Sequence, residues 1–305
     1  MIYDIIIVGA GTAGMTAALY ALRDNKTVLL LEGESIGGQI AYSPNVQNFP
    51  TVKQISGAEL ADLLFEQVTS HGAEVECEKV LSVVKKGERN FIVKTEYAEY
   101  LGKSVIIATG VKHRHIGVEG EEQLVGKGVS YCATCDGPFF AGEEVVLIGD
   151  ANTALQYAIS LSGYCKKVTV CTLFDKFFGE AKLVKTLKSK DNVEIFHNLS
   201  LQEFLTKDGQ LDGLRFLKTD TKKEFVIMTK GVFICVGQQP DNDAFKNIVE
   251  LDKNGFIVAG EDAKTSCLGV FAAGDCRTKK LRQLTTAAAD GAAAAVNACA
   301  YVDGI

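Results

Sequence analysis

The chain has 305 residues, with 32 basic and 38 acidic side chains and a formal net charge of −6. A hydrophobic fraction of 47% beside 23% charged residues is typical of a globular protein with a large core and excludes a disordered chain. The acidic balance argues against nucleic acid as the main ligand, and no apolar run reaches the roughly 18 residues that span a bilayer. The length predicts two domains or one unusually large one.

The first recognisable unit begins at the amino terminus. Residues 4–8 are predicted to be a buried strand, followed by an Ala- and Leu-rich helix that ends near Arg23 and by a second strand at 27–31 that leads to Glu32. Between the first strand and the helix stands Gly9-Ala10-Gly11-Thr12-Ala13-Gly14. This order is typical of a dinucleotide-binding Rossmann unit. Because the chain opens directly on this strand and shows no signal peptide, we expect a cytoplasmic protein.

Each residue of this pattern has a predicted role. Gly9 makes the turn, Gly11 lets the backbone approach a pyrophosphate at the helix N-terminus, and Gly14 allows close packing of helix on strand. Glu32 is placed to accept hydrogen bonds from a ribose. The first unit is therefore predicted to bind a dinucleotide.

Further elements of this unit follow along the chain. Ser56 and Glu59 form a capping box that opens an amphipathic helix to about His71. Short strands are predicted between residues 75 and 100, and residues 104–108 form a buried strand. These elements would complete the first sheet.

Nine cysteines occur in the chain, and in a cytoplasmic protein they do not indicate a disulfide framework. Cys132 and Cys135 form the Cys-x-x-Cys pair, and the other seven are predicted to be small hydrophobic residues in the core. A zinc site would need two more ligands at short spacing, and none lies nearby, so no metal site is predicted. The pair is therefore predicted to be redox-active.

The pattern of the first unit returns in the second half of the chain with changes. Residues 144–148 and 167–171 are predicted strands, and the turn after the first of them is Gly149-Asp150-Ala151-Asn152-Thr153-Ala154. A helix follows this turn, as in the first unit. We therefore expect a second Rossmann-like unit.

The changes fall on the positions that would hold a nucleotide. Ala151 replaces Gly11, so a Cβ would stand where a pyrophosphate approaches, and Asp150 adds negative charge to the turn. Thr172 replaces Glu32, and the Leu and Phe after it supply neither an acid for a ribose nor an arginine for a 2′-phosphate. The second unit is predicted not to bind a dinucleotide.

The remaining elements predict how the two units are connected. Residues 232–236 form another buried strand, and the last helix is predicted from about 283 to 301. We expect an α/β fold of two three-layer Rossmann-like domains, the second inserted into the first. The predicted first domain comprises residues 1–113 and 245–305, and the inserted domain residues 114–244.

Several motifs resemble those of low-molecular-weight thioredoxin reductases, in the same order along the chain. They are Gly9-Ala10-Gly11-Thr12-Ala13-Gly14, Gly37-Gly38-Gln39, Asn48-Phe49-Pro50, Ala108-Thr109-Gly110, Cys132-Ala133-Thr134-Cys135-Asp136-Gly137, Gly274-Asp275 and Arg282-Gln283. The resemblance covers essentially the whole chain. It implies FAD in the first unit, redox cysteines in the inserted unit, thioredoxin as substrate and a homodimer.

The resemblance also implies which residues contact FAD. The expected contacts are Gly9, Gly11, Thr12, Ala13, Gly14, Glu32, Gly38, Gln39, Asn48, Gly274, Asp275, Arg282 and Gln283. In the inserted unit it implies that Cys132 and Cys135 are catalytic, with Cys135 nearer the flavin.

The second unit departs from the members of this family that use NADPH. Those members have an intact glycine-rich turn and a basic cluster after the second strand, where this chain has Ala151 and residues 172–174. The ferredoxin-dependent flavin thioredoxin reductases resemble the chain in both respects, because they keep FAD and Cys-x-x-Cys but lack the pyridine-nucleotide motifs. The chain is therefore identified as most similar to that subfamily.

The chemistry of this resemblance agrees with the residues. A thiolate attacks a disulfide, and two cysteines three positions apart exchange between disulfide and dithiol with little backbone movement. FAD accepts single electrons or a pair, so it connects a one-electron carrier to a disulfide. Asp136, beside Cys135, is the predicted general acid/base for the thiols, the alternative being a turn-forming Asp before Gly137.

Charge offers a further indication of the electron donor. Residues 166–190 contain seven lysines against Asp175 and Glu180, and residues 277–282 form a second basic run. A local basic surface would steer docking of reduced ferredoxin, which is acidic; the alternative is an ordinary solvated face.

Two other functions stay open on the sequence. One is an NAD(P)H-dependent thioredoxin reductase with an atypical nucleotide site, which would need a rearrangement around Ala151 and another ribose contact. The other is a flavin-binding redox sensor whose cysteines switch a partner protein. Turnover with a disulfide protein distinguishes the sensor, and the choice of donor distinguishes the two enzymes.

Overall fold

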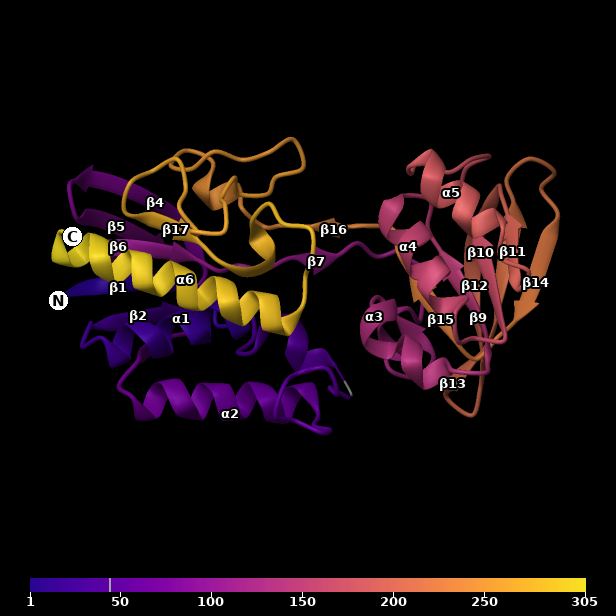
Figure 1. Cartoon of the computed structure of the whole chain (residues 1–305), viewed down its shortest axis with the longest axis horizontal. Coiled ribbons are helices and arrows are strands. Elements are labelled where there is room, and N and C mark those ends of the chain that lie inside the picture. The colour runs from indigo at the N-terminus through magenta and orange to yellow at the C-terminus, as the bar shows by residue number, and fades with distance from the viewer. Residues whose placement is uncertain (44) are drawn as a thin grey trace. The chain divides into compact units, whose positions relative to one another are not determined.

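The computed structural model describes residues 1–43 and 45–305. The described chain forms two compact units, shown in Figure 1. Unit 1 comprises Met1–Lys112 and Gln239–Ile305, and unit 2 comprises His113–Gln238. The second unit is thus inserted into the first along the chain.

A mainly parallel sheet forms the centre of unit 1. In spatial order its described strands are β3 (Glu74–Glu76), β2 (Val28–Leu31), β1 (Ile2–Val8), β6 (Glu99–Ile107), β5 (Asn90–Thr95) and β4 (Val80–Gly87), with β17 (Val270–Ala272) also paired to β6. Strands β3, β2, β1, β6 and β17 run parallel, whereas β5 and β4 are antiparallel to their neighbours.

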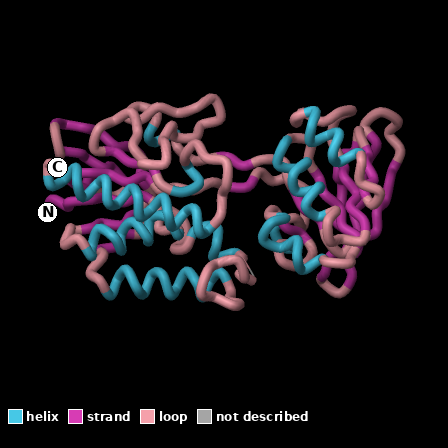
Figure 2. The backbone as a smooth tube through the Cα atoms, in the orientation of Figure 1, coloured by secondary structure: helices cyan, strands magenta, loops and turns pink. Residues whose placement is uncertain are grey.

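Alternating side chains give unit 1 its layers. Ile5 and Ile7 of β1 join the apolar cluster of the helical face, whereas Ile6 and Val8 join the cluster on the other face. Figure 2 shows the long helices lying beside one another along this unit. They are α1 (Thr12–Arg23), α2 (Gly57–Ser70) and α6 (Leu284–Asp303).

Helices α1 and α6 approach each other closely because small residues line their contact. A Cβ added at Gly291 would lie 2.2 Å from the carbonyl oxygen of Ala13. Ala17 and Ala294 belong to the same buried cluster. This packing fixes the start of α1, which follows the glycine-rich turn.

Unit 2 is built on an all-parallel sheet. In spatial order its strands are β11 (Val193–Phe196), β10 (Lys167–Cys171), β9 (Glu144–Ile148), β15 (Val232–Ile234) and β8 (Val129–Ser130). Its helices are α3 (Ala133–Asp136), α4 (Asn152–Leu161) and α5 (Ala181–Lys188). A separate antiparallel sheet contains β12 (Leu199–Lys207), β13 (Gln210–Lys218) and β14 (Glu224–Met228).

The two faces of β9 show how these parts form three layers. Val145 and Leu147 join the apolar cluster that contains residues of α4 and α5. Val146 and Ile148 join the cluster that contains residues of β12 and β13. The parallel sheet is therefore enclosed by helices on one face and by a second sheet on the other. The predicted α/β class with two Rossmann-like units is confirmed.

Short 3-10 helices occur in the connections. They are η1 (Gly38–Tyr42), η2 (Glu122–Leu124), η3 (Gly137–Phe140), η4 (Asp243–Phe245) and η5 (Gly274–Cys276). None of the helices in the described part of the chain is long and apolar enough to cross a membrane.

The chain passes between the units through β7 (Lys112–His113) and β16 (Gln238–Gln239), which form a two-stranded sheet. Residues 239–244, which the sequence assigns to the inserted domain, lie in unit 1. Asn242 explains the difference: its side chain accepts a hydrogen bond from the Thr109 hydroxyl and donates to the carbonyl oxygens of Gly255 and Cys276. These contacts hold the returning segment in unit 1.

Candidate dinucleotide site and redox disulfide

The turn between β1 and α1 needs glycine at two positions for reasons of packing. Gly9 has a φ of 108°, and a Cβ there would lie 2.4 Å from the carbonyl oxygen of Ala108 at the end of β6. A Cβ at Gly14 would lie 1.8 Å from the carbonyl oxygen of Gly9. Both residues therefore let the helix start tightly against the sheet.

Gly11 differs, because the protein around it would tolerate a side chain. Its φ is −78°, and among the described residues an added Cβ would meet only the carbonyl oxygen of Gly37, at the ordinary contact distance of 3.8 Å. Gly11 is the N-cap of α1, and no side chain in residues 1–43 or 45–305 caps that helix end. The missing Cβ thus leaves open space in front of backbone N–H groups, which suits a pyrophosphate. The turn fits FAD.

Glu32 is held against the same turn. One carboxylate oxygen accepts the Ala10 N–H at 2.7 Å, and the other accepts the Glu34 N–H at 2.8 Å. The Gly37 N–H in turn donates to the carbonyl oxygen of Ala10 at 2.9 Å. Two backbone segments and the end of β2 therefore meet at this carboxylate, in the place where Rossmann units bind a ribose.

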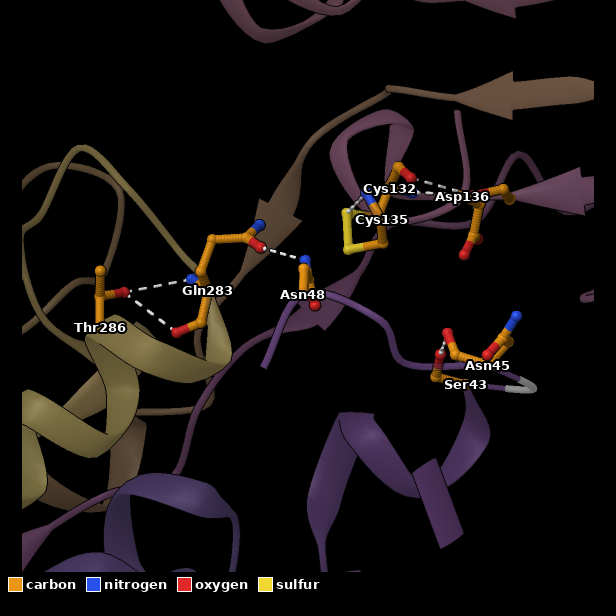
Figure 3. Close-up of a disulfide and its surroundings, with 9 residues drawn as sticks. Ser43, Asn45, Asn48, Cys132, Cys135, Asp136, Gln283 and Thr286 are labelled. Carbon is orange, nitrogen blue, oxygen red and sulfur yellow. Dashed lines mark hydrogen bonds between the residues drawn. A yellow bond between two sulfur atoms is a disulfide. The ribbon is translucent and has the colours of Figure 1, made fainter. Parts of the chain in front are cut away.

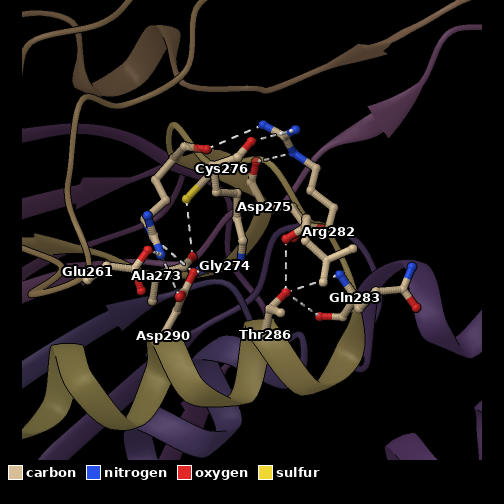
Figure 4. A network of polar contacts seen from close by, with 12 residues as sticks. Glu261, Ala273, Gly274, Asp275, Cys276, Arg282, Gln283, Thr286 and Asp290 are labelled. Carbon is tan, nitrogen blue, oxygen red and sulfur yellow. Dashed lines mark hydrogen bonds and ion pairs between the residues drawn. The ribbon is translucent and has the colours of Figure 1, made fainter. Parts of the chain in front are cut away.

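Asp275 carries a buried oxygen that lacks a partner. No described residue hydrogen-bonds to its Oδ1 (Figure 4). Burial raises its pKa to about 6, although the positive charges of Lys279 and Arg282 oppose the rise. A buried acceptor without a donor is costly, and a hydroxyl group of FAD would satisfy it.

The other expected FAD contacts lie nearby in unit 1 and are partly engaged with one another. The Asn48 amide donates to the Gln283 side chain at 3.1 Å, joining distant parts of the chain (Figure 3). The Arg282 guanidinium donates to the carbonyl oxygens of Asp275, Arg277 and Lys279. Arg282 therefore holds the 275–279 segment in shape.

Unit 2 contains a disulfide between Cys132 and Cys135 (Figure 3). Their Cα atoms are 5.3 Å apart across the first turn of α3, and the Cys135 N–H also donates to the Cys132 sulfur at 3.1 Å. The other seven cysteines are free thiols. Five are buried, as predicted, whereas Cys77 is exposed and Cys267 is half-buried.

Asp136 follows the disulfide and is fixed by Ser130. The Ser130 hydroxyl donates to the Asp136 carboxylate at 2.6 Å, and its oxygen accepts the Cys132 N–H at 3.0 Å. Burial raises the pKa of Asp136, and the Ser130 hydrogen bond partly offsets the rise. A carboxyl with a raised pKa beside two thiols is suited to proton transfer.

The alternative role for Asp136, that of a turn-forming residue, finds little support in its contacts. Asp136 stands as the N-cap of η3 but makes no side-chain capping hydrogen bond within the described chain. Its carboxylate is engaged by Ser130 instead.

Sequence reasoning missed two residues that shape these sites, Ser130 and Asp290. The only sequence signal of Ser130 is that it precedes the cysteine pair by two residues. The signal of Asp290 is stronger, because a lone carboxylate in an Ala-rich helix calls for a structural reason.

Asp290 organises the turn that carries Asp275. Its carboxylate accepts the Gly274 N–H at 2.9 Å (Figure 4). It also accepts two hydrogen bonds from Arg277 and one from Lys279. Burial acts to raise the pKa of Asp290, but the bonds from Arg277 and Lys279 outweigh it and hold the pKa below its usual value. This ion-pair network holds the turn that contains two predicted cofactor residues, Gly274 and Asp275.

The turn of unit 2 repeats the backbone of unit 1 but changes its side chains. Gly149 has positive φ, and a Cβ there would lie 2.5 Å from the carbonyl oxygen of Cys235, as Gly9 lies beside Ala108. Ala151 is the N-cap of α4 with extended backbone, as Gly11 is for α1. Its Cβ occupies the space that Gly11 leaves open.

Thr172, the counterpart of Glu32, makes its hydrogen bonds within the protein. It is fully buried, and its hydroxyl donates to the carbonyl oxygen of Phe174 and lies 2.7 Å from Nδ1 of His197. The Phe178 N–H donates to the carbonyl oxygen of Asp150 at 2.8 Å. That bond matches the one from Gly37 to Ala10 in unit 1, so an aromatic residue stands where unit 1 has glycine.

Comparisons with known proteins address the family. The model of the pyridine nucleotide-disulphide oxidoreductase family matches residues 3–291. The chain is 38% identical over 302 residues to a thioredoxin reductase of Bacillus subtilis, covering 99% of this chain and 95% of the relative. The crystal structure of thioredoxin reductase from Streptococcus pyogenes matches with a TM-score of 0.95 at 36% identity, covering 100% of this chain and 99% of that one.

A third relative bears on the electron donor. A ferredoxin-flavin thioredoxin reductase from Clostridium acetobutylicum matches with a TM-score of 0.55 at 30% identity, covering 100% of this chain and 98% of that one. The predicted likeness to the ferredoxin-dependent subfamily is thus weaker than the likeness to the thioredoxin reductases of Bacillus subtilis and Streptococcus pyogenes, and the family itself is named for pyridine nucleotides. The comparisons therefore favour the nicotinamide alternative.

The predicted kinship with low-molecular-weight thioredoxin reductases is confirmed at the level of the family, and with it FAD as cofactor and disulfide reduction as chemistry. The open turn at Gly11 and the unpartnered oxygen of Asp275 agree with that cofactor. The chain belongs to the pyridine nucleotide-disulphide oxidoreductase family.

Proposed function

We propose that the protein reduces the disulfide of thioredoxin through Cys132 and Cys135. The observation that carries this proposal is the disulfide itself, placed within one turn of a half-buried carboxyl, Asp136, that Ser130 holds in position. When bound and reduced by the electron donor, FAD would supply the electron pair that, with two protons, converts the disulfide to a dithiol.

The chain's own residues account for the transfer to thioredoxin. One thiolate of the reduced pair attacks the partner disulfide, forming a mixed disulfide and releasing one partner thiol. The second thiolate then attacks the mixed disulfide, which restores the Cys132–Cys135 bond and releases the second thiol. Asp136 stores the proton that a leaving thiolate needs, because its raised pKa keeps the proton available nearer to neutral pH.

The cofactor site belongs to the same proposal. Gly11 and the N-terminus of α1 would receive the pyrophosphate, Glu32 the ribose, and Asp275 a hydroxyl group. The remaining proposed contacts are Gly9, Thr12, Ala13, Gly14, Gly38, Gln39, Asn48, Gly274, Arg282 and Gln283. The predicted homodimer and cytoplasmic location also stay proposals.

For the electron donor we propose reduced ferredoxin. The supporting observation is the filled nucleotide site of unit 2: a Cβ at Ala151, a buried and hydrogen-bonded Thr172, and Phe178 at the position of Gly37. Each change removes a feature that unit 1 keeps for its dinucleotide.

A nicotinamide nucleotide is the second candidate donor, and the comparisons favour it over ferredoxin. It would bind in unit 2 only after the 172–178 segment leaves the N-terminus of α4, which breaks the hydrogen bond from Phe178 to Asp150.

Anaerobic bleaching of the bound flavin distinguishes these donors. The oxidised protein is mixed in turn with NADPH, NADH and reduced ferredoxin, and flavin absorbance is followed by stopped flow. Rapid bleaching by ferredoxin alone supports the first donor, and rapid bleaching by micromolar NADPH or NADH supports the second. Subsequent turnover of oxidised thioredoxin tests the reductase itself against a redox sensor, which would not turn over.

A further inference from the structure

Three large apolar side chains are exposed together after β10. Leu173, Phe174 and Phe178 are 48%, 50% and 57% exposed. The rings of Phe174 and Phe178 meet edge to face at 5.3 Å. We refer to these three residues as the 173–178 patch. Large apolar side chains gathered in this way mark a binding surface more often than scattered ones do.

The patch stands at the carboxyl end of a parallel strand, where α/β units bind their ligands. It is tied to the turn before α4 by the hydrogen bond from Phe178 to Asp150. The next residue but one, Glu180, donates its N–H to the Asn152 side chain at 2.7 Å and accepts from it at 3.2 Å. The segment is therefore fixed over the N-terminus of α4, where it presents the patch to solvent.

Four exposed lysines lie in the stretch from the patch to the end of α5, which also contains the acidic Asp175 and Glu180. Lys176, Lys182, Lys185 and Lys188 are exposed, and none forms an ion pair with a described residue. The Lys176 ammonium lies 5.6 Å from the centre of the Phe178 ring, and the other three are spaced three residues apart along α5. Positive charge is thus concentrated here on a chain whose net charge is −6.

A shallow groove lies along α5, beside the two residues that flank Phe178 in the chain, Phe177 and Gly179. It has a volume of about 600 Å³ and is lined by Phe177, Val184, Lys185 and Lys188, among others. An apolar floor with a basic rim matches the anatomy of a transient protein interface, in which apolar contacts give affinity and rim charges steer the encounter.

We propose that the 173–178 patch and its four lysines form the docking surface for a small acidic electron-carrier protein of the ferredoxin class. The proposal rests on the donor named under Proposed function and adds the place where that donor binds. The lysines attract the acidic carrier, and the patch buries its apolar side chains against the carrier on contact. According to this proposal, the carboxyl end of β10 in unit 2 binds a protein at the place where a nucleotide-binding unit would bind a nucleotide.

Binding of oxidised ferredoxin to the FAD-loaded protein, measured by calorimetry at low and at high salt, tests this surface. The charge variant is Lys185→Glu with Lys188→Glu, and the apolar variant is Phe174→Ser with Phe178→Ser. The matched control is Lys207→Glu with Lys223→Glu, two exposed lysines of unit 2 that also lack ion pairs with described residues. Flavin content and single-turnover thioredoxin reduction by photoreduced protein verify that each variant is folded.

We expect the charge variant to weaken binding about tenfold at low salt and to flatten its salt dependence, since rim charges act through long-range attraction. The apolar variant should weaken binding about as much while keeping the salt dependence, and the control should stay within about twofold.

Each other result has a defined meaning. If ferredoxin bleaches the flavin of the unmodified protein and both patch variants bind ferredoxin normally, the proposed docking surface is wrong, but ferredoxin remains the proposed electron donor. Ferredoxin that neither binds nor bleaches overturns both. If ferredoxin binds the unmodified protein but not the patch variants, and does not bleach the flavin, the docking surface is supported and ferredoxin as electron donor is contradicted. Loss of NADPH binding in the charge variant, with ferredoxin unaffected, assigns the surface to a nucleotide and overturns the proposal.

Discussion

The hydroxyl of Ser130 donates a 2.6 Å hydrogen bond to the carboxylate of Asp136, which ties the proposed proton carrier to the backbone of the redox disulfide. A bond of this kind favours the charged carboxylate and so limits how far burial raises its pKa. Ser130 is therefore a positioning residue that also sets the protonation of Asp136.

Replacing Ser130 by Ala should raise the pKa of Asp136 further. A hydrogen bond to a charged group contributes about 1.5–3 kcal/mol, which corresponds to a shift of about one pH unit or more. Thioredoxin turnover should fall on the alkaline side of its pH profile as Asp136 loses its proton, and this fall should move to higher pH by about that amount. Thioredoxin turnover from acid to alkaline pH measures it, and Ser130→Thr should restore the profile. An unshifted limb in Ser130→Ala would argue against this role.

Replacing Cys132 or Cys135 by Ser should abolish thioredoxin reduction and leave FAD bound, because the flavin residues lie in unit 1. Flavin absorbance and a thioredoxin turnover assay give the two readouts. The half-buried Cys267 is the control, since Cys267→Ser should keep normal turnover. Normal turnover in both variants of the pair would place the redox centre among the other thiols.

Replacing Gly11 by Ala should weaken FAD binding without unfolding the protein. Within the described chain the new Cβ meets only the Gly37 oxygen, at 3.8 Å, so the stability of the apoprotein should change by less than about 0.5 kcal/mol. Obstruction of the pyrophosphate should weaken affinity about 10- to 100-fold, measured by titration of apoprotein with FAD. Gly14→Ala is the contrast, because its Cβ would lie 1.8 Å from the Gly9 oxygen and should prevent normal folding. Equal FAD affinity in Gly11→Ala would contradict the proposed cradle.

Replacing Ala151 by Gly should not make NADPH reduce the flavin. The change removes one Cβ, but Thr172 stays buried and bonded to Phe174, and no arginine becomes available for a 2′-phosphate. Stopped-flow mixing with NADPH should give no rapid bleaching in either protein. Bleaching gained by this single change would show that Ala151 alone blocks the nucleotide.

Replacing Asp290 by Asn should destabilise unit 1 by about 3 kcal/mol, because it removes the buried counter-charge of Arg277 and leaves only the fully exposed Glu261, 4.0 Å away. The pKa of Asp290 in the folded state lies below its ordinary value of 3.8, so its stabilising contribution is present above that value and is lost as pH falls through the folded pKa. Urea unfolding from neutral to acid pH should therefore show a steeper acid loss in the unmodified protein than in the variant. Parallel curves would contradict this assignment.

The elements that the sequence predicts well are those with local signals. Gly9 and Gly14 mark the turn because the local packing admits no side chain there, and the alternating clusters of β9 follow from a run of apolar residues. The hairpin of β12 and β13 was not predicted, although the sequence has a local signal for it: Asp208-Gly209 is a typical two-residue hairpin turn, and both residues have positive φ in the structure.

Contacts between distant residues could not be predicted in this way. Thr172 meets His197 across neighbouring strands, and Asp290 meets Gly274 between the last helix and the end of β17. Asn242 returns the chain to unit 1 through bonds to three separate segments. Each of these contacts depends on the complete fold, and the hydrophobic periodicity of the sequence does not predict it.

The matched hydrogen bonds from Gly37 to Ala10 and from Phe178 to Asp150 show that the turns of the two units keep the same backbone contact although their side chains differ. The backbone frame of a nucleotide-binding turn is maintained by the protein's own contacts, because Gly149 is needed by the neighbouring strand whatever ligand is bound. A unit of this kind can therefore lose its nucleotide through a few side-chain changes and still keep its shape. Backbone similarity between two such units therefore does not show that both bind a nucleotide, and the side chains at 151, 172 and 178 are the places where the two units of this chain differ.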